Sequence, residues 1–254
     1  MTSHTDIVVD QFTRQAAPFA ASTAMRDEEA LKLLVDFSGA GADDTVLDVA
    51  CGPGLVVAAF AKSCRRAAGI DLTPAMIEKA REHAGALALS NVDWHIGNVT
   101  TLPFADRSFS VVVSRFAFHH FVDPLVVLRE MARVATRRIV VADMVASDDP
   151  GRAAALNRME KLRDPSHART LTLPELRGLF AQVHLPAPRE TFYDVRAELE
   201  RLLATSFPEP GDIPAIRQMF ADSLADDGLG MKTRQKDGMI LLSYPIAILA
   251  ADIA

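Results

Sequence analysis

The 254-residue sequence predicts an α/β fold built on a doubly wound, mostly parallel β-sheet. Three observations support this fold class. Short apolar or β-branched segments alternate with longer segments of helical spacing between Asp44 and Asp143, as in consecutive βαβ units. A Gly-X-Gly turn at residues 52–54 follows the first apolar segment and leads into a helix. Hydrophobic residues make up 49% of the chain and charged residues 24%, which is enough apolar material for one globular core.

The first half of the chain supplies most of the expected sheet. We expect strands at residues 46–49, 67–70, 92–96, 109–113 and 138–142. A helix at 55–62 follows the first strand. Thr73 and Pro74 start a second helix, because threonine is favoured at the N-cap and proline at the first helical position. Asp123 and Pro124 repeat this signal, and the apolar residues after them recur every three or four positions, as in a helix packed on a sheet.

The second half of the chain is less regular. Residues 147–151 are typical of a turn and end the alternation. Thr172 and Glu175 have the spacing of a capping box, so a helix should begin there. The remaining expected elements are a helix at 152–162, a strand at 191–195, a mainly helical segment at 197–228 and a last strand at 239–249, with a bulge at Pro245.

Charge and composition narrow the range of partners. Lys and Arg number 27 against 33 Asp and Glu, and the net charge of −6 argues against nucleic acid or an anionic membrane as partner. Cys51 and Cys64 suggest no disulfide framework, and the polar start at residues 1–4 is unlike a signal peptide. The apolar segment 239–251 is shorter than the about 20 residues of a membrane span. We therefore expect a cytoplasmic protein with a small-molecule partner.

The strongest local signal is the strand and turn at residues 46–54. Small residues at the end of a strand let a ligand lie against the backbone. Asp71 ends the next strand, nearly 20 residues after Gly52, and could accept hydrogen bonds from both ribose hydroxyls of an adenosyl ligand. A turn or helix-capping role is the alternative for Asp71. Val57 stands where a dinucleotide fingerprint has its third glycine, which argues against a nicotinamide-dependent oxidoreductase.

With these motifs the sequence resembles the class I S-adenosylmethionine-dependent methyltransferases, in particular the branch of the ubiquinone/menaquinone biosynthesis C-methyltransferases. The segments that carry the resemblance are LDVACGPG at 47–54, GIDLTPAMIEKAR at 69–81, GNVTTLPFADRSFSVVVSRFAFHHFVDP at 97–124 and LRDPSH at 162–167. The resemblance implies a Rossmann-like sheet of seven strands, mostly parallel, with an antiparallel last strand and a helical insert before it. It also implies S-adenosyl-L-methionine as the methyl donor.

The same resemblance implies one domain over residues 1–254. Residues 1–43 would form N-terminal cap helices, residues 44–143 the donor-binding core, and residues 144–254 a C-terminal part. The helical segment 197–228 would be a lid over the acceptor, since lids exclude water when they close. Packing or dimerisation is the alternative role of this segment.

The resemblance further implies where the donor lies. Gly52 and Gly54 would back its methionine part, Asp71 would hold the ribose, and Leu72 and Met76 would pack against the adenine. The other implied donor-binding residues are Asp48, Ala50, Cys51, Gly97, Asn98, Val99, Arg115 and Phe116. Related sequences usually have aspartate where this chain has Asn98. An asparagine oxygen can still accept a hydrogen bond from the adenine amino group, so we expect donor binding to be weaker rather than abolished.

Candidate catalytic residues are the histidines His119, His120 and His167, with His120 the first choice as a base because imidazole titrates near neutrality. A core or helix-capping role is their alternative. Candidate substrate-binding residues are Phe19, Arg163 and Asp164; an exposed loop with an Arg–Asp pair is the alternative for the last two. No residue cluster indicates a metal site.

The expected function is methyl transfer to a carbon, oxygen or nitrogen atom of a small metabolite, by a monomer or homodimer. In-line displacement is the expected mechanism, since the donor already carries an activated methyl group and the protein mainly has to position the nucleophile. Two alternatives remain: a non-catalytic S-adenosylmethionine-binding protein and, less favoured, a nicotinamide-dependent oxidoreductase.

Overall fold

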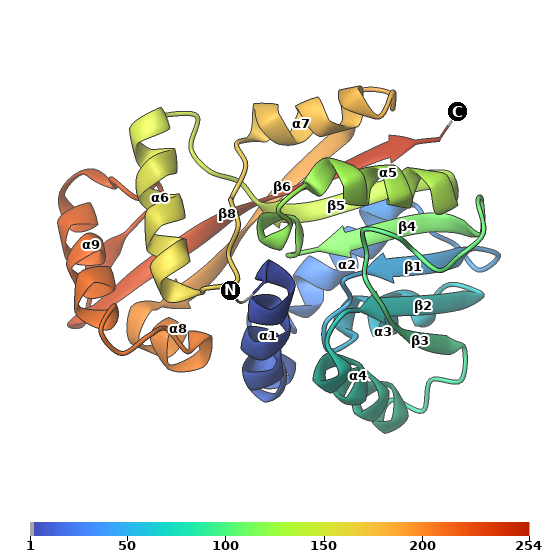
Figure 1. Cartoon of the computed structure of the whole chain (residues 1–254), viewed down its shortest axis with the longest axis horizontal. Coiled ribbons are helices and arrows are strands. Elements are labelled where there is room, and N and C mark those ends of the chain that lie inside the picture. Colours follow the sequence, from blue (N-terminus) through green and yellow to red (C-terminus); the bar gives the residue numbers. More distant parts are fainter. Residues whose placement is uncertain (1–2, 254) are drawn as a thin grey trace.

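Within residues 3–253, which the computed structural model describes, eight strands form one continuous sheet (Figure 1). Seven of them follow the order β3-β2-β1-β4-β5-β8-β6, and β7 pairs only with β8. The strands are β1 (Thr45–Val49), β2 (Arg66–Asp71), β3 (Val92–Ile96), β4 (Phe109–Arg115), β5 (Ala135–Met144), β6 (Arg189–Glu198), β7 (Arg234–Lys236) and β8 (Met239–Asp252). The expected strands are all present, and most of them are longer than the sequence pattern indicated.

The direction of the strands confirms the expected fold class. β1 pairs in parallel with β2 and β4, β2 with β3, and β4 with β5. β8 is antiparallel to both of its long neighbours, β5 and β6, and lies between them rather than at the edge. The expected bulge at Pro245 is absent, because Pro245 pairs with Asp194 in an unbroken register. Pro245 disturbs the sheet little at this position. It lies opposite Val145, one residue beyond the end of β5, so the N–H group that proline lacks would fall where the pairing of β5 with β8 ends.

Helices cover both faces of the sheet. α2 (Glu28–Ser38), α3 (Leu55–Ala61) and α4 (Pro74–Ala86) pack on one face, where Leu34, Phe60 and Ile77 are fully buried. α5 (Pro124–Val134) and α7 (Leu173–Gln182) pack on the other, through residues such as Leu128 and Phe180. Because both faces are covered, the strands consist of nearly continuous apolar segments. The capping box of Thr172 and Glu175 is present at the start of α7, as expected.

A third apolar cluster surrounds the projecting ends of β6 and β8. It is covered by α6 (Pro150–Arg163), α8 (Leu199–Ser206) and α9 (Ile213–Asp226), at the left of Figure 1. Phe220 of α9 and Met159 of α6 are fully buried in it. The helix α1 (His4–Ala21) stands apart from these layers, between α4 and α8.

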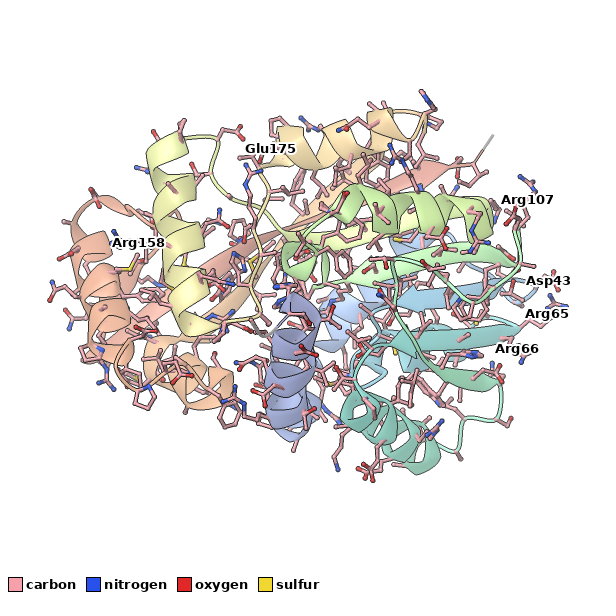
Figure 2. The ribbon with its side chains drawn as sticks, viewed as in Figure 1. Asp43, Arg65, Arg66, Arg107, Arg158 and Glu175 are labelled. Carbon is pink, nitrogen blue, oxygen red and sulfur yellow. The ribbon has the colours of Figure 1, made fainter. Side chains whose placement is uncertain are left out.

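The parallel strands point their carboxyl ends toward α1 (Figure 1). The opposite ends of β1 and β2 carry charged side chains at the far edge of the molecule, among them Asp43, Arg65 and Arg66 (Figure 2). In open α/β sheets, ligands bind beyond the carboxyl ends of the strands, close to where the strand order reverses. Here that point lies between β1 and β4.

Candidate active site

A cavity of about 350 Å³ lies at this point, between α1 and the carboxyl ends of β1, β2 and β4. Four groups of residues line it. They are Asp48, Ala50, Cys51, Gly52, Pro53, Leu55 and Val56 of the first turn; Asp71, Leu72, Met76, Asn98, Val99 and Thr100; Arg115, Phe116, Ala117, His120, Phe121, Val122, Asp123 and Val126; and His4, Thr5, Val8, Phe12, Phe19 and Met25. The cavity therefore brings together most of the donor-binding residues that the sequence indicated.

Asp71 holds the turn after β1 in place. Its two carboxylate oxygens accept hydrogen bonds from the backbone N–H groups of Gly52 and Thr73, both at 2.8 Å. Ala50 and Gly52 have positive φ angles of 58° and 49°, so the chain bends sharply and leaves open space beside the strand end. Burial raises the pKa of Asp71, although the hydrogen bonds from Thr73 and Gly52 act in the opposite direction.

Two buried polar atoms in the cavity wall have no protein partner among the described residues. One is Oδ1 of Asp48 and the other is Nη2 of Arg115. The rest of the Arg115 guanidinium is fixed, since Nε donates to the hydroxyl of Tyr193 at 3.3 Å and Nη1 to the carbonyl of Met25 at 3.1 Å. Burial, and then the charge of Asp71, raise the pKa of Asp48 well above its ordinary value. Buried polar groups are normally satisfied, so these atoms indicate a ligand with both a cationic and an anionic group.

Two of the expected donor-binding glycines lie outside the cavity wall. At Gly54, with φ of 75°, an added Cβ would lie 2.4 Å from the Trp94 ring and 2.8 Å from Cβ of Ala80. At Gly97 an added Cβ would lie 3.1 Å from the side chain of Ile70. Glycine is therefore needed at residue 54 for close packing against Trp94 and Ala80, while a side chain at residue 97 would require only a small shift of Ile70.

Asn98 lies at the cavity edge, and its side-chain oxygen is already engaged. Oδ1 accepts hydrogen bonds at 2.9 Å from both the backbone N–H and the hydroxyl of Thr100. The part of the side chain left free is therefore the NH₂ group, which donates and does not accept. The expectation that the Asn98 oxygen is available to the adenine amino group does not fit this geometry.

The other half of the cavity is apolar and is covered by α1. Val8, Phe12 and Phe19 of this helix face Phe121 and Val122, and Val122 is 73% exposed at the rim. His120 lies among these groups, and the ring of Phe12 packs edge-on against it with the ring centroids 4.8 Å apart. Phe19 lines this half of the cavity, and its role in substrate binding stays a prediction.

Of the three candidate histidines, only His120 lines this cavity. His119 is buried beneath it and makes two contacts with Asp143: its Nδ1 lies 2.7 Å from Oδ1, and its backbone N–H donates to Oδ2 at 3.0 Å. Burial lowers the pKa of His119, but the charge and hydrogen bond of Asp143 outweigh this and raise it. His167 is 1% exposed, and its Nε2 contacts Oδ1 of Asn157. Asp143 of β5 and Asn157 of α6 thus hold these two histidine side chains in the core, outside the cavity wall.

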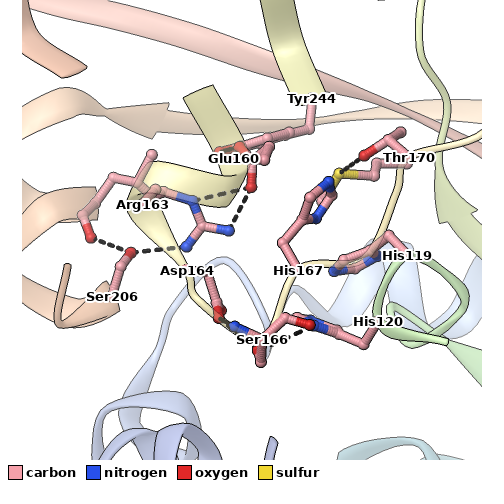
Figure 3. Close-up of polar contacts among 12 residues, drawn as sticks. His119, His120, Glu160, Arg163, Asp164, Ser166, His167, Thr170, Ser206 and Tyr244 are labelled. Atoms are coloured by element: carbon pink, nitrogen blue, oxygen red, sulfur yellow. Dashed lines mark hydrogen bonds and ion pairs between the residues drawn. The ribbon is translucent and has the colours of Figure 1, made fainter. Parts of the chain in front are cut away.

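Arg163 and Asp164 are also buried and do not line the cavity, contrary to both sequence interpretations. Figure 3 shows the side chains that they contact. Arg163 pairs with Glu160 and donates to the hydroxyl of Ser206 at 2.8 Å. Tyr244 donates to the other oxygen of Glu160, also at 2.8 Å. Sequence reasoning missed Glu160, although it lies one helical turn before Arg163 on the same face of α6 and could have been noticed from that spacing.

The caps of the cavity also differ from expectation. No residue of the segment 197–228 lines it, because α8 and α9 are held by their apolar faces against β6, β8 and α6. α2 is not a cap either, since Leu34 packs on the sheet. The cover over the cavity comes from α1 together with Met25. The segment 197–228 is packed against the sheet and α6 here, and a lid role for it stays a prediction.

Comparisons with known proteins agree with this geometry. Residues 47–138 match a family described as "Methyltransferase domain". The chain is 30% identical over 209 residues to the uncharacterized methyltransferase YcgJ of Bacillus subtilis, which covers 82% of this chain and 81% of that protein. The chain belongs to the methyltransferase family. The methyltransferase is also 38% identical over 105 residues to a UbiE ubiquinone/menaquinone biosynthesis C-methyltransferase of Bdellovibrio bacteriovorus, covering 41% of this chain and 44% of that enzyme.

Solved structures share the fold of the methyltransferase. The YcgJ structure superposes with a TM-score of 0.81 at 25% identity and covers 88% of this chain and 97% of its own. Geranyl diphosphate C-methyltransferase from Streptomyces coelicolor, in complex with S-adenosyl-L-homocysteine, has the same fold with a TM-score of 0.65 at 21% identity, covering 89% of this chain and 78% of that one. The methyltransferase thus has the class I fold, and its methyl donor is S-adenosyl-L-methionine.

Residues 3–253 also lack the features of two other kinds of site. No helix there is both long enough and apolar enough to cross a membrane. The same residues contain no group of three or more His, Cys, Asp or Glu side chains arranged to hold a metal ion.

Proposed function

We propose that the methyltransferase transfers the methyl group of S-adenosylmethionine to a small molecule with an apolar body, and that His120 receives the proton of the attacking atom. The observation that carries the proposal is the division of the cavity. One end holds the unsatisfied atoms of Asp48 and Arg115, and the other end is apolar except for a few groups, of which His120 lies deepest.

The polar end suits the amino-acid part of the donor. The ammonium group would lie against Oδ1 of Asp48, and the carboxylate would accept a charge-assisted hydrogen bond from Nη2 of Arg115. Asp71 would accept hydrogen bonds from the ribose hydroxyls, while Leu72, Met76 and Val99 offer apolar contacts for the adenine. The donor, when bound, supplies an activated methyl group, so the residues around it need only align the acceptor in contact with that group.

The apolar end suits an acceptor with an aromatic or aliphatic body. Phe12, Phe19 and Phe121 line this end, and a desolvated nucleophile there would face the methyl group without competition from water. A hydroxyl, amine or acidic C–H group of the acceptor would donate its hydrogen to His120. Burial lowers the pKa of His120, so the ring is neutral near pH 7 and its nitrogen lone pair can accept a proton, as a weaker base than free imidazole.

Calorimetry and a product assay test this proposal. Titration of the purified chain with S-adenosylmethionine should give saturable binding, and titration with NADH should not. Formation of S-adenosylhomocysteine is then measured with a panel of phenols, quinols, amines and β-dicarbonyl compounds. Turnover of an apolar member would support the proposal, whereas donor binding without turnover of any member would favour the non-catalytic binding protein.

His120→Ala separates the roles of donor binding and proton transfer. General bases typically contribute a factor of about 10²–10⁴, so turnover should fall by about a hundredfold or more while donor affinity stays within about twofold. Unchanged turnover in His120→Ala would eliminate the base.

A further inference from the structure

His120, the histidine that faces the cavity, contacts Ser166, which in turn bonds to Asp164, and neither Ser166 nor Asp164 lines the cavity. Nδ1 of His120 lies 3.2 Å from the backbone carbonyl oxygen of Ser166 and 3.1 Å from its hydroxyl oxygen (Figure 3). The Ser166 hydroxyl in turn donates to Oδ1 of Asp164. Ser166 is fully buried and Asp164 is 2% exposed. The three side chains form a chain of hydrogen bonds that leads from the cavity into the core.

The direction of each hydrogen bond in this chain follows from chemistry. Asp164 accepts from the backbone N–H of Ser166 at 2.8 Å and from Nε2 of Gln15 at 3.2 Å. Burial alone would raise the pKa of Asp164, but His120 when it is protonated, the charge of Arg163 and the Ser166 hydrogen bonds lower it, and the last two act also when His120 is neutral. The carboxylate is therefore ionised and cannot donate, so the hydroxyl hydrogen of Ser166 points to Asp164. The Ser166 hydroxyl oxygen therefore presents a lone pair, and not a hydrogen, to Nδ1 of His120.

Both neighbours of Nδ1 are consequently acceptors, because a carbonyl oxygen can only accept. Nδ1 must carry the hydrogen of the neutral ring, which leaves the lone pair on Nε2. No hydrogen bond of the described residues involves Nε2, and His120 lines the cavity. The neighbouring His119 also favours a neutral His120 ring. Its ring centroid lies 4.2 Å from that of His120, and Asp143 stabilises a proton on His119, which would repel a second positive charge on His120.

We propose that Ser166 and Asp164 are positioning residues that fix His120 in the tautomer with Nε2 unprotonated, aim that atom at the acceptor, and stabilise the imidazolium that forms during transfer. This inference rests on the proposed function. As the acceptor atom bonds to the methyl carbon, the carbon–sulfur bond breaks and its electron pair stays on the now neutral sulfur. The acceptor's proton passes to Nε2. The positive charge thus moves from sulfur to His120, where the carboxylate of Asp164 faces it through Ser166.

The helix α1 completes this arrangement. Gln15 donates to Asp164 from one side of α1, and Phe12, three residues earlier, packs against the His120 ring. His4 at the start of α1 has its Nε2 2.9 Å from the backbone oxygen of His120. The helix that covers the acceptor therefore also holds both ends of the hydrogen-bond chain.

Nitrogen NMR of ¹⁵N-histidine-labelled full-length protein, saturated with S-adenosylhomocysteine, tests the tautomer without a known acceptor. The His120 signals, assigned by their loss in His120→Gln, should report a protonated Nδ1 and an unprotonated Nε2. Ser166→Ala keeps the carbonyl oxygen of residue 166 but removes the hydroxyl acceptor, so part of the His120 population should shift toward the other tautomer. Ser223→Ala, which also removes a buried hydroxyl but lies outside the cavity wall, should leave the signals unchanged.

Turnover provides the second readout once an acceptor is found. Ser166→Ala and Asp164→Asn should each lower kcat by about tenfold to a hundredfold, with donor affinity and acceptor KM within about twofold. A wild-type His120 protonated on Nε2, or a Ser166→Ala spectrum identical to wild type, would overturn the inference and leave methyl transfer itself standing. If the protein binds S-adenosylhomocysteine but turns over no acceptor, the proposed function fails while the tautomer result still decides the positioning role.

Discussion

Asp48 is buried, and its Oδ1 has no hydrogen-bond partner among the described residues. It lies next to Asp71, and both groups have a pKa above the ordinary range of a carboxyl. Because the folded-state pKa of Asp48 exceeds the unfolded value, its contribution to stability is complete at low pH and is lost as the pH rises through the folded pKa. Near neutral pH the burial of the Asp48 carboxyl group therefore opposes folding of the ligand-free protein, and in the proposed binding mode the donor's ammonium group would relieve this cost.

We expect Asp48→Asn to stabilise the ligand-free protein at pH 7–8 by about 1–2 kcal/mol and to weaken donor binding at least tenfold, because it removes the buried charge that the ammonium group would meet. The advantage in stability should shrink as the pH is lowered. Thermal unfolding across a pH series and calorimetry with S-adenosylmethionine measure the two effects. Asp252→Asn is the matched control: Arg138 lowers the pKa of Asp252, so this change should not stabilise. An unstabilised Asp48→Asn variant would contradict the prediction.

Asn98→Asp should tighten donor binding by about threefold to tenfold. The present oxygen is used by Thr100, whereas a carboxylate offers a second, free acceptor for the adenine amino group. Calorimetry with S-adenosylmethionine checks this, with Asn98→Ala as the comparison that removes the Thr100 contacts. Equal affinities of Asn98→Asp and wild type would show that the adenine amino group does not reach residue 98.

The residues of the first two strands that line the cavity could be predicted from the sequence. The chain of hydrogen bonds from His120 through Ser166 to Asp164 could not. Asp48, Gly52 and Asp71 lie at the ends of two adjacent strands, so strand pairing alone brings them together. His120, Ser166 and Gln15 come from three distant segments that meet only through the packing of α1 and the loop after α6. Sequence spacing carries no information about such contacts. The pairing of Arg163 with Glu160 is different, because their i, i+3 spacing on α6 could have indicated it.

At the scale of elements, α1 is held by polar as well as apolar contacts. Gln11 and Gln15 are almost fully buried, and both donate to the backbone carbonyl of Ser206, the last residue of α8. These bonds satisfy a carbonyl that a helix end leaves without a partner. The sequence indicated that 197–228 is helical with an apolar face, but an apolar face does not say which neighbour it covers, so its packing against α6 and the sheet could not be predicted.

The double variant Gln11→Ala, Gln15→Ala should loosen α1 without unfolding the core. A buried carbonyl left unsatisfied costs about 1–3 kcal/mol, so the helix should open more often. Brief trypsin treatment should cleave it faster after Arg14, at least fivefold, and S-adenosylhomocysteine should slow that cleavage. Gln182→Ala, an exposed glutamine of α7, is the control and should cleave like wild type. Equal cleavage rates would mean that the apolar contacts alone hold α1.

At the scale of the whole molecule, β8 connects the donor-binding half of the sheet to β6 and the cluster of α6, α8 and α9. Ile248 and Leu249 are fully buried on opposite faces of the sheet. The doubly wound class and this last strand followed from composition, periodicity and family resemblance, since these properties are spread over many residues and do not depend on a single contact.

Leu249→Ala should lower the free energy of unfolding by about 2–5 kcal/mol, because it leaves a cavity in the core below α5 and α7. The loss should appear in one cooperative transition if β8 couples both halves of the sheet. Chemical denaturation followed by circular dichroism measures it, with Leu87→Ala, at an exposed leucine, as the control that should change little. Two separate transitions in Leu249→Ala would contradict the coupling.

The position of β8 also determines the order in which the molecule can be completed during synthesis. β5 and β6 leave the ribosome first but do not pair with each other, since their shared neighbour is residues 239–252. Until these residues emerge, each strand has an open edge, and open edges are the places where unfinished chains associate with one another. A nascent chain paused before residue 239 would thus be exposed to aggregation, and chaperone contact would be most useful during this interval.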